Sequence, residues 1–246
     1  MTRFGLIGYP VGHSYSQNFF TKKFKKLKLK DHVYDLFEME FLNEFPALWL
    51  KHSDLHGLNV TVPHKEKVVK YLDKQDASAI KVGAANVIYK TGGQLIGYNT
   101  DYMAFRESLK AWIGDGFKGE ALILGSGGAS KAVQAGLTDL DIPYNQVSRT
   151  NKGGDYTYDQ IKANPEIITR FKLIVNTTPL GMYPNNESIP DLPYNQIKKG
   201  TYFYDLIYNP EETAFMKEGK KYGAEIKNGL EMLELQAERS WDIWNS

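Results

Sequence analysis

The chain has 246 residues, 42% of them hydrophobic, so it can form one large domain or two modest ones. Its 30 basic and 29 acidic residues give a formal net charge of +1, which argues against nucleic-acid binding. With no cysteine, it has no disulfide, cysteine nucleophile or cysteine-ligated metal. No apolar run approaches the ~20 residues of a membrane helix, and the amino terminus does not resemble a signal peptide. We therefore expect a cytoplasmic protein without a membrane partner.

Strand and helix patterns alternate along the first part of the chain. We expect strands at residues 4–8, 33–37, 57–62, 85–89 and 94–98. The last two flank Thr91-Gly92-Gly93, which predicts a hairpin. Apolar residues at helical spacing predict helices at residues 16–29, 41–50, 64–72 and 102–112.

A second α/β unit begins near Glu120. We expect its strands at residues 121–124, 144–147, 173–176, 202–205 and 225–226. Its helices are expected at residues 131–140, 212–222 and 230–244. The alternation predicts an α/β protein with mainly parallel sheets, two domains and a cleft between them, where ligands commonly bind.

A glycine-rich run, LGSGGAS, occupies residues 124–130 between an apolar strand pattern and a helix pattern. In dinucleotide-binding folds such a turn carries a pyrophosphate. Gly125 permits the tight turn, and Gly127 lets the backbone approach phosphate oxygens. Ser130 stands at the third position of the fingerprint, where Gly or Ala is usual. An ordinary strand-to-helix turn is the alternative.

The end of the next predicted strand bears on the choice of nucleotide. Folds that prefer NAD usually place an acidic residue there for the ribose 2′-hydroxyl, but this chain has Ser148-Arg149-Thr150. A guanidinium suits a 2′-phosphate because it offers a planar pair of donors. Lys152 could add charge. The segment therefore favours NADP, with a solvated loop arginine as the alternative.

Lys65 and Asp101 form a candidate acid–base pair among polar clusters at predicted strand ends. Oxidising an alcohol to a ketone requires removal of the hydroxyl proton, which a lysine beside a carboxylate can accept. The alternatives are a solvated Lys65 at a helix start and an Asp101 that caps the following helix. His52 and His56 lie four residues apart in a loop-like context, so we expect no metal site.

The motifs, taken together, resemble the shikimate dehydrogenase family over nearly the whole chain. They are GYPVGHSYS (8–16), NVTVPHK (59–65), GAAN (83–86), NTD (99–101), GSGGAS (125–130), SRT (148–150), NTTPLGM (176–182), YDLIYNP (204–210) and GLEMLELQ (229–236). The resemblance implies reduction of 3-dehydroshikimate to shikimate with NADPH. It also implies a substrate-binding catalytic domain of residues 1–101 plus 229–246 and a Rossmann-like NADP-binding domain of residues 102–228.

The resemblance further implies roles for individual residues. Lys65 would be the catalytic acid/base, with Asp101 beside it. The substrate carboxylate would be held by Ser14 and Ser16, and its hydroxyl groups by Thr61, Asn86, Asp101 and Gln236, with Tyr208 close by. The pyrophosphate would be held by Gly125, Ser126, Gly127, Gly128 and Ala129, the 2′-phosphate by Ser148, Arg149 and Thr150, and the nicotinamide side by Thr177, Leu206 and Gly229.

The chain departs from the family pattern at Val87, where a threonine is usual, and at Tyr102, where a glycine is usual. Tyr102 would either narrow the substrate pocket or pack on its helix. A quinate/shikimate dehydrogenase of broader specificity and a non-catalytic NADP-binding regulator are the alternative functions. A hydrolase is a third, because Gly12-His13-Ser14 is faintly similar to a nucleophile elbow. We expect a monomer or a homodimer.

Overall fold

The computed structural model describes residues 1–12, 14–150 and 153–246, so His13 and Lys152 lie outside the described residues. The chain divides into two compact units, one of Met1–Met103 with Leu235–Ser246 and the other of Ala104–Glu234. These boundaries lie inside two helices, α4 (Thr100–Ile113) and α8 (Leu230–Trp244). They differ by a few residues from the divisions expected after residues 101 and 228.

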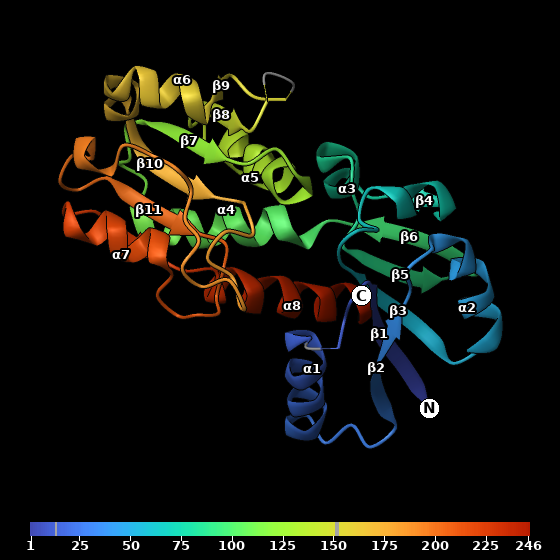
Figure 1. Cartoon of the computed structure of the whole chain (residues 1–246). Helices are drawn as coiled ribbons and strands as arrows, with labels where there is room; N and C mark the ends of the chain where they lie inside the picture. The colour runs from blue at the N-terminus through green and yellow to red at the C-terminus, as the bar shows by residue number, and fades with distance from the viewer. Residues whose placement is uncertain (13, 151–152) are drawn as a thin grey trace. The chain divides into compact units, whose positions relative to one another are not determined.

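The first unit contains a mixed sheet of six strands (Figure 1). The strands are β1 (Thr2–Gly8), β2 (His32–Glu38), β3 (Leu55–Val60), β4 (Lys74–Gln75), β5 (Val87–Thr91) and β6 (Gln94–Tyr98), in the spatial order β2-β1-β3-β5-β6-β4. Strand β5 is antiparallel to both β3 and β6, which corrects the expectation of mainly parallel pairing here. The predicted hairpin is the reason: Gly92 and Gly93 have φ of 56° and 78°, and a two-residue turn joins antiparallel strands.

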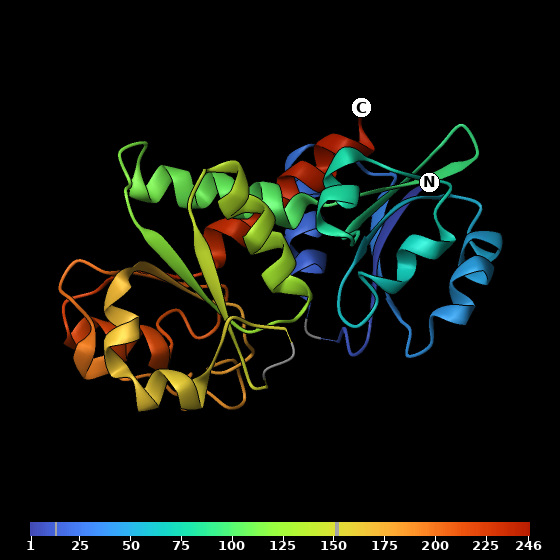
Figure 2. The same ribbon diagram turned by 90° about the horizontal axis from the view of Figure 1, so that it is seen from above.

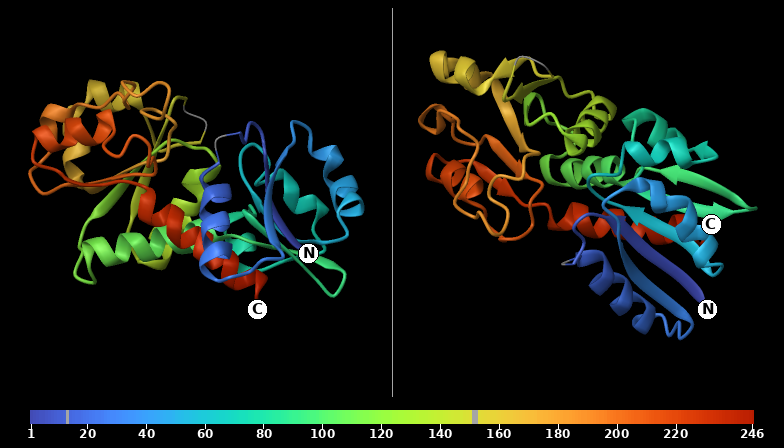
Figure 3. Two further views of the ribbon diagram at one scale, coloured as in Figure 1. Left: turned by 90° about the horizontal axis from the view of Figure 1, so that it is seen from below. Right: turned by 45° about the vertical axis from the view of Figure 1, so that its right-hand side comes forward.

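Helices cover both faces of this sheet. Helices α1 (Tyr15–Lys26) and α8 pack on one face, where Phe4, Phe20 and Trp244 are buried (Figure 3). The opposite face packs against α2 (Phe45–Lys51) and α3 (Ala77–Val82) around Leu58. Trp244 donates a hydrogen bond to the Ile88 carbonyl at 3.0 Å. The end of the chain is therefore part of this first unit.

The second unit contains an entirely parallel, Rossmann-like sheet. Its strands are β7 (Glu120–Leu124), β8 (Tyr144–Ser148), β9 (Tyr156–Thr157), β10 (Phe171–Asn176), β11 (Tyr202–Asp205) and β12 (Glu225–Lys227), in the order β12-β11-β10-β7-β8-β9. Helices α4 and α5 (Gly128–Asp139) lie on one face, and α6 (Tyr158–Ala163) and α7 (Ala214–Lys221) on the other (Figure 2). From β7 the next strands, β8 and β9, are added on one side, whereas β10, β11 and β12 are added on the other, so the strand order reverses between β7 and β10.

Several helices differ from the prediction. Helix α5 begins at Gly128 rather than at residue 131. The helix expected at 64–72 is a turn followed by a 3-10 helix, Lys67–Tyr71. The helix expected at 41–50 is divided into a 3-10 helix, Leu42–Glu44, and α2, which has a proline in its first turn. Within the described residues no helix is long and apolar enough to cross a membrane.

Candidate active site

Polar residues of the predicted motifs lie where two inner strands of the first sheet end and begin. Thr61 directly follows β3 and Asn86 directly precedes β5, and the two strands are paired with Asn59 opposite Val87. Because β5 is antiparallel to β3, the end of one strand and the start of the other meet at the same edge. The Thr61 amide donates to the Ile7 carbonyl at 2.9 Å, which ties this edge to β1.

Lys65 and Asp101 form an ion pair at this edge. The Lys65 ammonium donates to Asp101 Oδ2 at 2.8 Å, and the two side chains are 25% and 16% exposed. Lys65 lies in the turn before the 3-10 helix, and its carbonyl accepts the Ala85 amide at 2.8 Å. A solvated lysine at a helix start is therefore the wrong interpretation. The partly shielded pair suits proton transfer to and from a bound alcohol or ketone.

Asn99, rather than Asp101, caps helix α4. The Tyr102 amide donates to Asn99 Oδ1 at 3.2 Å, and Asn99 Nδ2 donates to the Ala84 carbonyl at 2.9 Å. The Asp101 carboxylate is thus available to Lys65 instead of the helix terminus. Tyr102 is 8% exposed, with the Lys81 ammonium 5.7 Å from its ring centre. The Tyr102 ring is thus buried beside α3, which carries Lys81, and its effect on the substrate pocket stays a prediction.

Asn86 fixes the first turn of the same helix. Its Nδ2 donates to Thr100 Oγ1 at 2.9 Å, and its Oδ1 accepts the Thr100 amide at 2.7 Å. Asn86 is buried, with 3% of its surface exposed. Asn86 therefore positions the segment that carries Asp101.

The two predicted carboxylate-binding serines lie at the start of α1. Ser14 is the N-cap residue, yet its side chain makes no capping hydrogen bond in the part of the chain that the structure describes. Ser16 is hydrogen-bonded to Tyr34, and burial raises the pKa of that phenol well above its usual value. Tyr34 in turn donates to Asn59 Oδ1 at 2.8 Å. The hydroxyl of Ser16 is thus held by a buried polar network.

This network continues to helix α8 and the segment of Gln236. Asn59 Nδ2 donates to Ser240 Oγ at 2.9 Å, and the Ser240 hydroxyl donates to the Gln236 carbonyl at 2.7 Å. Sequence reasoning missed Tyr34 and Ser240 altogether. Asn59 stood in a quoted motif without a role, whereas the other two gave no signal, since a single tyrosine or serine in a strand or helix is ordinary.

The glycine turn of the second unit lies where the strand order reverses. Gly125 follows β7 with a φ of 106°, and a Cβ there would lie 2.9 Å from Thr177 Oγ1. Thr177 follows β10, and both its amide and its hydroxyl donate to the Leu124 carbonyl, at 3.0 and 2.7 Å. Open parallel sheets bind ligands at the carboxyl ends of strands at such a reversal.

The residues of this turn fit a pyrophosphate. Gly127 is the N-cap of α5 and, being glycine, has no side chain to cap the helix. A Cβ at Gly127 would meet open space. Ser126 precedes the cap, and Gly128 and Ala129 begin the first turn of the helix, with Ser126 and Ala129 exposed. The amino end of a twelve-residue helix therefore has its N–H groups accessible to an anion.

The segment expected to bind the 2′-phosphate follows β8. Ser148 is buried, and its hydroxyl donates to the Thr150 carbonyl. Arg149 and Thr150 are exposed. Burial raises the pKa of Tyr158 to about 12, and the positive charge of Arg149 opposes that rise, so the guanidinium lies near the phenol. An exposed guanidinium at this strand end suits pairing with a phosphate.

The loop after β11 contains the predicted residues Leu206 and Tyr208. Gly229 packs on it: its amide donates to the Ile207 carbonyl at 3.0 Å, and a Cβ on Gly229 would lie 2.0 Å from the Leu206 oxygen. Only glycine fits that approach without moving the loop. Burial raises the pKa of Tyr208, which is half-buried. Tyr208 lies in the second unit, unlike the other residues expected to hold the substrate.

Asp205 is a buried carboxylate that stood in a quoted motif without a role. The residue is fully buried, and its carboxylate accepts hydrogen bonds from Asn176 Nδ2 at 3.1 Å, the Ile207 amide at 3.0 Å and Thr213 Oγ1 at 2.6 Å. Burial raises the pKa of Asp205 to about 6 in spite of these donors. The carboxylate therefore joins the ends of β10 and β11 to the start of α7.

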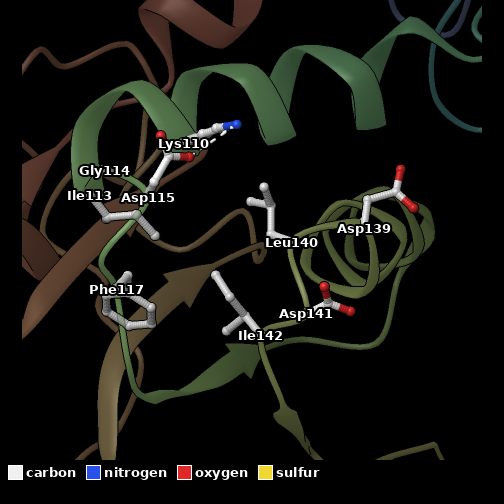
Figure 4. Close-up of a pocket in the computed structure, with 9 residues that line it drawn as sticks. All are labelled: Lys110, Ile113, Gly114, Asp115, Phe117, Asp139, Leu140, Asp141 and Ile142. Atoms are coloured by element: carbon white, nitrogen blue, oxygen red, sulfur yellow. Dashed lines mark ion pairs between the residues drawn. The ribbon is translucent and has the colours of Figure 1, made fainter.

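A pocket in the second unit is not part of this site. It is lined by the carboxyl end of α4 and its following loop and by the end of α5, including Lys110, Phe117, Asp139 and Ile142 (Figure 4). None of the predicted site residues lines it. It lies where the chain enters β7 and β8, whereas the glycine turn follows the carboxyl end of β7.

The fold and these residues together define a class of enzyme. A parallel sheet with an accessible glycine turn in the second unit and a lysine–carboxylate pair in the first are the parts of a nicotinamide-dependent oxidoreductase. Residues 6–88 match the family model of the shikimate dehydrogenase substrate binding domain. The chain is 40% identical to a shikimate dehydrogenase (NADP(+)) of Methanococcus maripaludis, over 98% of this chain and 90% of that protein.

Solved structures agree with this match. Shikimate dehydrogenase from Aquifex aeolicus has a TM-score of 0.87 and 32% identity, covering 100% of this chain and 92% of its own. Shikimate 5-dehydrogenase from Thermus thermophilus, in complex with NADP(H) and shikimate, has a TM-score of 0.86 and 30% identity, covering 99% and 93%. The chain belongs to the shikimate dehydrogenase family. A hydrolase is therefore the wrong interpretation of Ser14.

Proposed function

We propose that this chain catalyses the reversible, NADPH-dependent reduction of 3-dehydroshikimate to shikimate, a step of aromatic amino-acid biosynthesis. The Lys65–Asp101 ion pair, 2.8 Å long and partly shielded, is the observation that carries the proposal. Its support is the family membership and the similarity to a structure solved with NADP(H) and shikimate.

Lys65 is the acid and base of this reaction. During reduction its ammonium donates a proton to the oxygen of the carbon that is reduced, and in the reverse direction the amine removes that proton. Asp101 keeps the ammonium oriented and stabilises its charge. Bound NADPH supplies the hydride. Asn86 keeps Asp101 in place through Thr100, at 2.7 and 2.9 Å.

The remaining polar residues of the first unit bind the substrate. Ser14 and Ser16 hold its carboxylate through their hydroxyl groups. Thr61, Asn86, Asp101 and Gln236 hold its ring hydroxyls, and Tyr208 contributes from the second unit. Residues 1–101 and 229–246 make up the substrate-binding catalytic domain of this proposal.

The cofactor binds to the domain of residues 102–228, with Gly229 at its boundary. Gly125, Ser126, Gly127, Gly128 and Ala129 contact the pyrophosphate through backbone N–H groups. Ser148, Arg149 and Thr150 contact the 2′-phosphate, and Thr177, Leu206 and Gly229 line the nicotinamide side. The exposed guanidinium of Arg149 selects NADP over NAD. A cytoplasmic monomer or homodimer completes the proposal.

Isotope transfer tests the reaction directly. The protein is incubated with 3-dehydroshikimate and NADPH that carries deuterium at the nicotinamide C4 position. We expect shikimate with one deuterium on the carbon that bore the ketone. Binding of NADPH without formation of labelled shikimate would exclude the proposed reaction.

A further inference from the structure

Two carbonyl groups of the glycine turn are held by side chains, one from the neighbouring strand β8 and one from Ser130 at the end of the run. Gln146, in the middle of β8, donates from Nε2 to the Gly125 carbonyl at 2.7 Å and to Ser130 Oγ at 3.1 Å. The Ser130 hydroxyl donates to the Gly127 carbonyl at 2.6 Å. A carbonyl oxygen can only accept, so the amide nitrogen of Gln146 must face Gly125.

These bonds determine where the neighbouring N–H groups point. The Gly125–Ser126 and Gly127–Gly128 peptides are not among the cis bonds of the chain, and in a trans peptide the C=O and N–H point in opposite directions. With the carbonyls of Gly125 and Gly127 held toward Gln146 and Ser130, the amides of Ser126 and Gly128 are directed away from them. Oriented N–H groups bind an anion, whereas a carbonyl oxygen would repel it.

We propose that Gln146 is a positioning residue for the cofactor pyrophosphate, acting with Ser130 by holding two carbonyls of the glycine turn away from the phosphates. The inference rests on the proposed NADP site. It also gives Ser130 a role at a position where a smaller residue is usual. The contribution of Ser130 is the smaller one, because its own amide also donates to the Gly127 carbonyl, at 3.0 Å.

The backbone around Gln146 is held independently of its side chain. Its amide donates to Asp155 Oδ2 at 2.7 Å, its carbonyl accepts the Asp155 amide at 2.8 Å, and it lies opposite Ile123 in the sheet. Leucine has a similar size and suits a half-buried strand position. Gln146→Leu therefore removes the two donors while leaving β8 in register.

The test compares the binding of two nucleotides, with shikimate as a further ligand, in three variants. NADP+ contains the pyrophosphate, whereas adenosine 2′-monophosphate contains only the part expected at Arg149. Gln146→Leu is measured against Gln196→Leu, which changes an exposed glutamine of the same unit. We expect Gln146→Leu to raise the Kd for NADP+ about tenfold, as for the loss of one or two hydrogen bonds, with the Kd for adenosine 2′-monophosphate and that for shikimate unchanged. Ser130→Ala should have a smaller effect in the same direction.

The contrary outcomes are distinct. An unchanged NADP+ Kd in Gln146→Leu would overturn the role of Gln146, and so would equal weakening of both nucleotides, which indicates general damage to the unit. If the unmodified protein binds neither nucleotide, the proposed NADP site is wrong, and the inference that rests on it is wrong as well.

Discussion

Lys65 depends on one neighbour for its chemistry. Its ammonium is 2.8 Å from Asp101, and the carboxylate is available because Asn99 caps the helix instead. Asn99 and Asp101 are only two residues apart, and either side chain is of a type that can cap a helix. The cap at Asn99 therefore leaves Asp101 to pair with Lys65, as the proposed catalysis requires.

Replacing Lys65 with alanine should lower kcat by a factor of about 10²–10⁴, because the proton transfer loses its positioned group. The KM for shikimate should change much less. Steady-state kinetics of shikimate oxidation measure both values. The matched control is Lys67→Ala, an exposed lysine in the same segment. Near-normal turnover in Lys65→Ala would remove Lys65 from catalysis.

Replacing Arg149 with alanine should raise the KM for NADP+ by about 10- to 150-fold, the loss of roughly 1.5–3 kcal/mol from a charged hydrogen bond. The KM for NAD+ should hardly change, because NAD+ has no 2′-phosphate. Arg149→Lys keeps the charge without the planar fork and should be intermediate. Equal effects on the two nucleotides would show that Arg149 does not contact the 2′-phosphate.

At the scale of elements, the sequence predicted the strands better than the helices. All five strands of the second unit that were expected are present, and β7 and β10 follow clear apolar runs, whereas the two-residue strand β9 was not expected. The short helices α3 and α6 were missed, since six residues show too little periodicity, although Asp76 and Thr157 cap them. The pairing of β4 with β6 depends on distant contacts that no local pattern contains.

The start of α8 illustrates how close packing positions the loop after β11. Gly229→Ala would place a Cβ 2.0 Å from the Leu206 oxygen, so the loop or the helix must move. We expect a loss of stability of about 1–3 kcal/mol, as for overpacking of a core, and a higher KM for NADP+. Urea unfolding and kinetics measure these effects. Gly116→Ala, where a Cβ would meet open space, is the control and should change neither.

At the scale of the whole molecule, the two-domain α/β organisation followed from the alternation of patterns and was confirmed by the structure. The antiparallel hairpin of β5 and β6 was expected, whereas the antiparallel pairing of β5 with β3 was not. The buried networks of Tyr34 and Asp205 could not be predicted either, because each joins segments far apart in the sequence through single polar residues. Motifs identify residues that contact ligands, whereas the residues behind them become visible only in three dimensions.

Asp205 should make the stability of the protein depend on pH. Its pKa is raised from 3.8 to about 6, so between these values the native state keeps a proton that the unfolded chain releases. This group therefore contributes stability below pH 4 that is lost as the pH rises through about 6, a change of about 3 kcal/mol. Urea unfolding from pH 4 to 7 should show this loss, relative to Asp205→Asn.

An exposed residue serves as the matched control for this measurement. Asp159→Asn changes a carboxylate on the surface of α6 and should leave the pH dependence of the unmodified protein intact. A pH dependence that is the same in Asp205→Asn and in the unmodified protein would show that Asp205 does not retain its proton on folding.

The absorbance of the reduced nicotinamide during turnover tests the central claim most directly. The protein is given shikimate or quinate, each with NADP+ or NAD+. Rapid reduction of NADP+ with shikimate, and much slower reaction in the other three mixtures, is the expected result. Equal activity with quinate would contradict the proposed substrate, and equal activity with NAD+ the role of Arg149. Absence of reduction in every mixture, from folded protein that binds NADP+, would contradict the proposed catalysis itself.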